Sequence, residues 1–120
     1  MIPKDVVICD WHYERPDQTP VYFAMKGFRV VTCPWRTPPK AVMQAEDMAR
    51  WRKYATPEMK PRYYGMVLTT WMDNGGFIDG FYGDVSDRAK GAVHPKNAEY
   101  TPWDTFKAMY KRMDELEKEK

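Results

Sequence analysis

Three short runs of β-branched and other apolar residues divide the chain, and each ends in a tryptophan among polar or ring-bearing residues. Such runs are typical of strands that are buried on both faces. Between and after them, apolar residues recur at helical spacing. The pattern predicts strands over residues 5–10, 28–34 and 65–71 and helices over residues 20–26, 38–54 and 102–118.

Four Thr-Pro pairs are predicted to start helical segments, at residues 19–20, 37–38, 56–57 and 101–102. A threonine hydroxyl can accept a hydrogen bond from a free backbone amide, and proline at the first helical position loses an N–H that has no partner. Thr101 followed by Asp104 resembles a capping box. In the last helix, six apolar residues are expected to face the core: Trp103, Phe106, Met109, Tyr110, Met113 and Leu116.

The alternation of strands and helices predicts parallel neighbours joined by crossover connections. Residues 72–100 are rich in glycine but also carry aromatic side chains that favour packing, so we expect a lid loop over the strand ends. The expected fold is therefore α/β, a partial (β/α) barrel of three parallel strands with crossover helices. A long Gly-rich loop and a C-terminal helix complete this single domain over residues 1–120.

Composition excludes some classes of protein. With 43% hydrophobic residues and a net charge of +2, the chain lacks the basic cluster of a nucleic-acid-binding protein. No stretch is apolar enough for a membrane span, and the first residues do not resemble a signal peptide. Cys9 and Cys33 are expected as buried free thiols, with a bridge between strands as the alternative. No cofactor-binding motif is present, and the thiols do not indicate a compartment.

The residues at the strand ends are the candidate site, because parallel strands place their carboxyl ends at one edge. Alternation puts Asp10 and His12 on one side of the first strand. They are expected to bind substrate hydroxyls, to close the rim as an ion pair, or, with His94, to bind a metal ion. The indole of Trp35 stacks on a sugar beside Arg36 in one interpretation and plugs the strand end in the other. The predicted substrate-binding residues are Asp10, Trp11, His12, Tyr13, Trp35, Arg36, Trp71, Asp73 and Asn74.

These strand ends resemble part of the catalytic barrel of family-20 glycoside hydrolases, the β-N-acetylhexosaminidases and their relatives. The matching segments are residues 6–11, 28–35 and 65–73, which correspond to the sixth, seventh and eighth barrel strands. The resemblance implies that Trp71 walls an acetamido pocket and that Asp73 replaces a glutamate that grips sugar hydroxyls. The Tyr-x-Asp feature of the seventh strand is missing after Trp35, and so is the catalytic Asp-Glu pair of the fourth strand.

We therefore expect the substrate-binding portion of a glycoside hydrolase-like barrel that acts on hexosaminide-type sugars. No catalytic residue is predicted, so the isolated chain is expected to be inactive as a glycosidase. The alternatives are a fragment of a metal-dependent barrel hydrolase and a non-enzymatic carbohydrate-binding module. The expected partners are carbohydrate and either the remainder of the barrel or further copies of the chain in an oligomer, because an incomplete sheet exposes its edges and one face.

Overall fold

Three parallel strands form an open sheet in the order β1-β2-β3. The computed structural model describes residues 1–13, 17–35, 37–91 and 98–120. The strands are β1 (Val7–Asp10), β2 (Arg29–Thr32) and β3 (Tyr63–Met66). Asp10 lies opposite Thr32 in the first pair, and Thr32 lies opposite Met66 in the second. The mixed α/β class and the parallel sheet expected from the sequence are therefore present.

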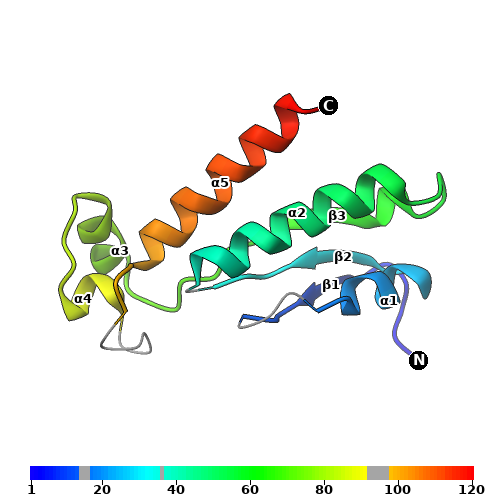
Figure 1. Ribbon diagram of the computed structural model, residues 1–120. Coiled ribbons are helices and arrows are strands. Elements are labelled where there is room, and N and C mark those ends of the chain that lie inside the picture. The colour runs from blue at the N-terminus through cyan, green and yellow to red at the C-terminus, as the bar shows by residue number, and fades with distance from the viewer. Residues whose placement is uncertain (14–16, 36, 92–97) are drawn as a thin grey trace.

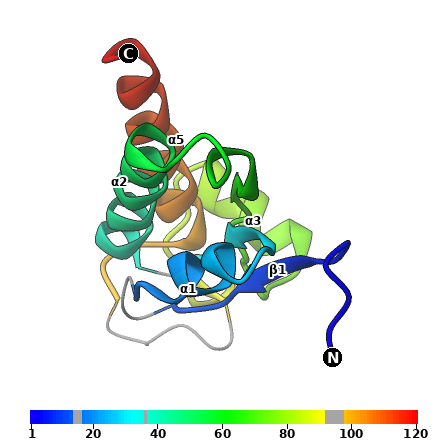
Figure 2. The same cartoon turned by 90° about the vertical axis from the view of Figure 1, so that its right-hand side faces the viewer.

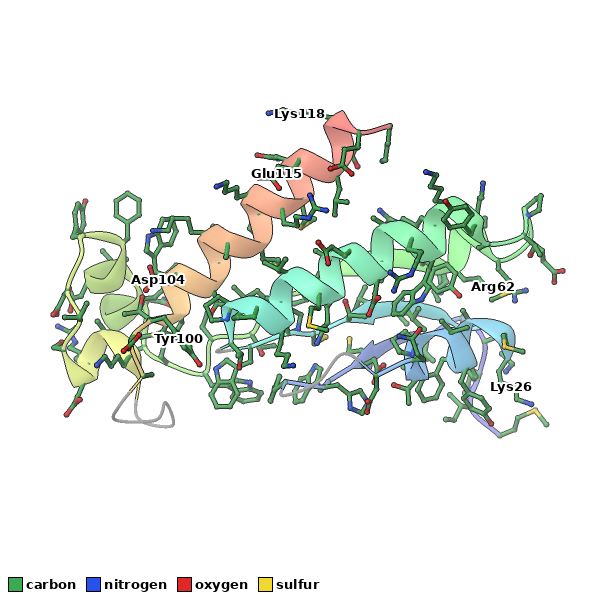
Figure 3. The ribbon with its side chains drawn as sticks, viewed as in Figure 1. Lys26, Arg62, Tyr100, Asp104, Glu115 and Lys118 are labelled. Atoms are coloured by element: carbon green, nitrogen blue, oxygen red, sulfur yellow. The ribbon has the colours of Figure 1, made fainter. Side chains whose placement is uncertain are left out.

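Helices connect and extend the sheet, as Figure 1 shows. They are α1 (Thr19–Met25), α2 (Pro38–Tyr54), the 3-10 turn η1 (Lys60–Arg62), α3 (Asn74–Phe81), α4 (Asp87–Lys90) and α5 (Pro102–Lys118). The bounds of α2 and α5 equal the predicted ranges, and α1 is displaced by one residue. Figure 3 labels Arg62 at the end of η1, where its Nη1 donates to the carbonyl oxygen of Ala24 at 2.8 Å and ties the turn to α1.

One face of the sheet is covered by both crossover helices. Ala24 of α1 and Met48 of α2 pack in one cluster with Val30 and Tyr63 of the strands. Figure 2 shows α1 and α2 on the same side of the sheet. Residues that alternate to the opposite face, such as Val7 and Cys9, are exposed. The sheet therefore has one apolar core, between its strands and these two helices.

The third strand differs from the prediction, which placed it over residues 65–71. It begins at Tyr63, whose ring is buried beside Val30, and regular pairing ends at Met66. The amide of Val67 still donates to the carbonyl oxygen of Thr32 at 2.9 Å. In a parallel ladder the next bond would come from the amide of residue 34, and Pro34 has no N–H to donate. Regular pairing is therefore interrupted at Pro34, although the amide of Thr69 still donates to the carbonyl oxygen of Pro34 at 3.0 Å.

The segment expected as a long loop contains two helices, which is a correction to the sequence reading. Helix α3 forms despite three glycines because Asp73 caps it, accepting a hydrogen bond from the amide of Gly76 at 2.9 Å. A Cβ at Gly76 would lie 2.6 Å from the carbonyl oxygen of Arg88, so glycine lets α4 approach closely. Glycine here permits two helices to pack closely, whereas the sequence analysis predicts a loop from the same glycines.

The start of α5 confirms the predicted capping box. The amide of Thr101 donates to Oδ2 of Asp104 at 2.8 Å, and the hydroxyl of Thr101 accepts from the amide of Asp104 at 3.4 Å. Figure 3 labels Asp104 in the first turn of α5. At α2, by contrast, Thr37 is the capping residue but its side chain makes no capping bond. The Thr-Pro pairs therefore mark the starts of α2 and α5, although only the hydroxyl of Thr101 accepts a capping hydrogen bond.

The apolar stripe of α5 is only partly in the core. Met109 is buried, whereas the rings of Trp103 and Phe106 contact α3 through Phe77, with centroids 5.8 and 5.9 Å away. Tyr110 is exposed, which corrects its expected place in the core. Further along, Nε of Arg112 lies 2.9 Å from a carboxylate oxygen of Glu46 and links α5 to α2.

Candidate functional site

Four aromatic rings from all three strand ends gather at one edge of the sheet. Tyr13 lies 4.9 Å from Trp35 between centroids, and Trp11 lies 5.4 Å from Trp71, both in edge-to-face geometry. Tyr13 and Trp11 stack at 6.2 Å and join the two pairs. The convergence follows from parallel pairing, which brings residues beyond each carboxyl end to the same edge. We call these four rings the strand-tip aromatic cluster.

Trp11 and Trp71 supply the accessible indole surface of this cluster, with exposed fractions of 51% and 55%. The indole N–H of Trp71 donates to the hydroxyl of Tyr13 at 2.7 Å, which fixes the orientation of the ring. Trp71 also has a φ of 51°, the left-handed region that non-glycine residues rarely adopt. Backbone in this region is strained and persists where the surrounding contacts enforce it.

Trp35 has a different place in the cluster. Only 9% of it is exposed, and its indole N–H donates to the carbonyl oxygen of Thr70 at 3.1 Å. The ring therefore closes the end of β2 and holds the segment that leads to Trp71. This arrangement favours the interpretation in which Trp35 plugs the end of the strand over the one in which its indole stacks on a sugar. Its predicted companion Arg36 lies outside the described residues.

Asp10 and His12 lie on the same side of β1, as alternation predicted. Asp10 is buried, and its two carboxylate oxygens are 2.6 Å from the hydroxyl of Thr19 and 2.9 Å from Nε2 of His12. The other ring nitrogen of His12 is 3.3 Å from a carboxylate oxygen of Asp17. The imidazole therefore lies between two carboxylates, each within reach of one ring nitrogen. Of the three predicted roles, the geometry favours the ion pair that closes the rim.

Two residues that the sequence reading did not assign to the site support this polar group. The side-chain amide of Gln44 in α2 donates to the carbonyl oxygen of His12 at 2.6 Å. Thr19 was expected to cap α1, but Gln18 is the capping residue and the hydroxyl of Thr19 binds Asp10 instead. Gln44 could have been noticed as a polar residue within the otherwise apolar stripe of Ala41, Ala45 and Met48.

Asp73 caps α3 and Asn74 is its first residue, and neither is part of the aromatic cluster. The carboxylate of Asp73 accepts from the amide of Gly76 and lies 3.6 Å from the guanidinium of Arg88. These two contacts hold the pKa of Asp73 below its usual range, the backbone hydrogen bond being the larger cause. The side chain of Asp73 is still exposed. Asn74 lines a groove beside the chain that follows β3.

This groove has a volume of about 390 Å³ and lies between the chain after β3, helix α3 and helix α5. Five of its lining residues are apolar, and Thr70, Asn74 and Tyr110 add polar groups. The lining residues are Met66, Val67, Leu68, Thr70, Asn74, Phe77, Phe106 and Tyr110. Because Thr70 also binds Trp35, the groove and the aromatic cluster share one supporting segment.

The thiols and the potential metal ligands add little to the site. Cys9 and Cys33 are both free, but only Cys33 is buried, so the expectation for Cys9 is corrected. Burial, followed by the neighbouring Cys9, raises the pKa of Cys33 to about 12. Among residues 1–13, 17–35, 37–91 and 98–120, no three His, Cys, Asp or Glu side chains are arranged to hold a metal ion. His94, which the metal reading needs, lies outside these ranges.

Comparison with known proteins gives no family assignment. The chain matches no protein-family model, and a search of curated proteins finds no match. Within the described part of the chain, none of the helices has the length and apolar character needed to cross a membrane. The functional interpretation therefore depends on the geometry of the strand ends.

Proposed function

We propose that the strand-tip aromatic cluster binds carbohydrate, as the substrate-binding portion of a glycoside hydrolase-like barrel that acts on hexosaminide-type sugars. The observation that carries this proposal is the pair of half-exposed indoles, Trp11 and Trp71, held at right angles by neighbouring rings. An indole face covers the apolar face of a pyranose, while nearby polar groups bind its hydroxyls. The exposed carboxylate of Asp73 is a candidate for that second task, whereas both ring nitrogens of His12 are held by Asp10 and Asp17.

The one-sided packing of helices supports the barrel part of the proposal. In a (β/α) barrel every crossover helix lies outside the sheet, and the inner face is filled by side chains of the strands. Both crossover helices of this chain lie on one face, with Ala24 and Met48 in the same cluster. Such a barrel requires further strands. We propose that either the remainder of a longer protein or further copies of the chain supply them.

A non-enzymatic carbohydrate-binding module is the second candidate. The buried carboxylate of Asp10 is fully engaged by Thr19 and His12, and that of Asp73 caps α3. Both carboxylates are thus engaged by groups of the protein, whereas glycoside hydrolysis requires two acids that flank the glycosidic bond. We therefore expect binding without turnover from this chain.

The test measures sugar binding and hydrolysis with the purified 120-residue chain. Calorimetric titration with N-acetylglucosamine, N-acetylgalactosamine and glucose is expected to show saturable binding of at least one sugar. Trp11→Ala and Trp71→Ala are expected to weaken that binding at least tenfold. Tyr82→Ala removes a ring that is more exposed but lies at the end of α3, so it serves as the matched control with unchanged affinity.

Two outcomes would contradict the proposal. The aromatic cluster is not a carbohydrate site if the chain binds no sugar of the panel. The same conclusion follows if Tyr82→Ala and Trp71→Ala lose equal amounts of sugar affinity. Turnover of an aryl hexosaminide that survives repurification would show that the chain carries its own catalytic groups. Binding without turnover leaves the choice between the two candidates to a hydrolysis assay on a longer gene product.

A further inference from the structure

Seven lysine and arginine side chains gather at the amino end of the sheet. They come from segments that precede the parallel strands or end α1 and α2, which is why the sequence alone shows no basic cluster. The same segments, residues 1–5, 26–29 and 52–62, contain two carboxylates, those of Asp5 and Glu58. Figure 3 labels Lys26 and Arg62 at this end of the molecule. We call the group the basic end, and its members are Lys4, Lys26, Arg29, Arg52, Lys53, Lys60 and Arg62.

The three arginines of the basic end are held by groups of the protein. The guanidinium of Arg29 donates to the hydroxyl of Tyr64 at 3.0 Å. Nε of Arg52 donates to the carbonyl oxygen of Tyr63 at 2.7 Å. Arg62 ties η1 to α1. The planar donor groups that would grip a single phosphate in a bidentate way are therefore already engaged.

The lysines of the basic end carry charge that no carboxylate compensates. Nζ of Lys4 donates to the carbonyl oxygen of Lys26 at 2.6 Å, at the carboxyl end of α1. In the described part of the chain, Arg62 alone of this group lies within salt-bridge distance of a carboxylate, that of Glu58 at 3.0 Å. A lysine ammonium is a mobile point charge, so several of them on one surface suit an extended anionic partner.

Exposed aromatic and apolar side chains lie among these cations. Tyr22 and Met25, which flank Lys26 on α1, are 57% and 67% exposed, and Tyr54 beside Lys53 is 73% exposed. The two ammonium groups lie over the tyrosine rings, 5.5 and 5.3 Å from the centroids. Lysine, tyrosine and apolar side chains together are typical of surfaces that lie at the boundary of lipid headgroups and acyl chains. A nucleic acid would use the lysines but would leave Met25 in water.

We propose that the basic end binds the surface of a membrane that contains anionic phospholipids. The negative surface potential of such a membrane attracts the lysines, and the exposed apolar side chains enter the headgroup region. Salt screens this attraction. The strand-tip aromatic cluster lies at the carboxyl ends of the strands, at the other end of the sheet, so this inference does not rest on carbohydrate binding.

The experiment measures cosedimentation of the purified chain with vesicles of phosphatidylcholine and with vesicles of phosphatidylcholine mixed with phosphatidylserine. At low salt we expect binding to the mixed vesicles alone, and high salt should weaken it at least tenfold. The double variant with Lys26→Glu and Lys60→Glu should lower the partition coefficient at least tenfold, because each basic residue near an anionic surface contributes a factor of about five.

The matched control is the double variant with Lys111→Glu and Lys118→Glu. It makes the same change of charge at exposed lysines of α5, and Figure 3 labels Lys118 far from the basic end. This control should keep most of the vesicle binding. Met25→Gln removes an apolar side chain without changing the charge and should weaken vesicle binding at least threefold. Far-ultraviolet circular dichroism checks that each variant is folded.

Four results would overturn the proposal. They are no binding to mixed vesicles at low salt, equal binding to both kinds of vesicle, equal losses in the two double variants, and unchanged binding in Met25→Gln. A single-stranded oligonucleotide that displaces the chain from vesicles, combined with the last result, would assign the basic end to a nucleic acid instead. If the variant at Lys26 and Lys60 fails to fold, the lipid and salt dependence of the wild type decides. Sugar binding, present or absent, has no bearing on these results.

Discussion

Replacing Trp71 by glycine and by alanine separates the backbone strain of the strand tip from the contribution of the indole. Both variants lose the hydrogen bond to Tyr13 and the edge contact with Trp11. They differ in the backbone, where the φ of 51° at position 71 is left-handed. A non-glycine residue in the left-handed region loses about 1 to 2 kcal/mol of stability, which glycine does not lose. Glycine, however, loses more conformational entropy on folding, which cancels about 0.5 to 1 kcal/mol of that advantage.

Trp71→Gly should therefore be more stable than Trp71→Ala by about 0.5 to 1 kcal/mol. For a chain of this length the difference corresponds to about 2 to 4 °C in Tm. Thermal unfolding followed by circular dichroism measures it, with urea unfolding as a second estimate. Calorimetric titration should show that neither variant retains the sugar affinity of the wild type.

The reasoning fails if Trp71→Ala is as stable as Trp71→Gly, because position 71 would then carry no left-handed strain. It also fails if both variants bind sugar as tightly as the wild type. In that case the strained backbone would serve packing alone. A combination of higher stability in Trp71→Gly with lost binding in both variants supports a strained residue that is retained for binding.

Other predictions concern the thiols, the helix caps and acid stability. In dilute native protein, a thiol reagent should modify Cys9 and leave Cys33 unmodified until unfolding, because burial raises the pKa of Cys33 to about 12; mass spectrometry of the labelled peptides checks this. Thr101→Ala should lower the free energy of unfolding in urea by about 1 kcal/mol, whereas Thr37→Ala, whose side chain makes no capping bond, should change it little. The lowered pKa of Asp73 means that its contribution to stability is present above the unfolded pKa, about pH 4, and is lost as the pH falls through the lower folded value. Urea unfolding between pH 5 and pH 2 should therefore show a smaller loss of stability in Asp73→Asn than in the wild type.

The parts of the fold that follow local rules could be predicted from the sequence. The β-branched runs at Val7 and Val30 form strands, and the Thr-Pro pairs mark the first residues of α2 and α5. The convergence of the strand-end rings also follows from parallel pairing alone. What could not be predicted depends on tertiary contacts. Helix α3 is capped by Asp73 and packs closely on α4 at Gly76, and the low helix propensity of its sequence gives no sign of that contact.

The polar side of the strand ends was harder to predict than the aromatic side. Asp10 was expected to bind a ligand or to close the rim as an ion pair with His12, and Thr19 and His12 occupy its carboxylate. A sequence does not show which polar residues of a distant helix will reach a buried carboxylate. The same limit applies to Gln44, which binds the backbone of His12 across 32 positions of the chain. Residue types therefore indicated a polar site at this edge, but only tertiary structure shows which groups remain free for a ligand.

The most direct test of the central claim is a titration of the chain with carbohydrate, followed through the indole N–H signals in nuclear magnetic resonance spectra. The signals of Trp11 and Trp71 should shift in a saturable way with the sugar that binds in calorimetry. Those of Trp51, which stacks on Tyr63 in the core, and Trp103, which packs on α3, should not move. Shifts confined to Trp51 or Trp103, or no shift at saturating sugar, would contradict a carbohydrate site at the strand-tip aromatic cluster.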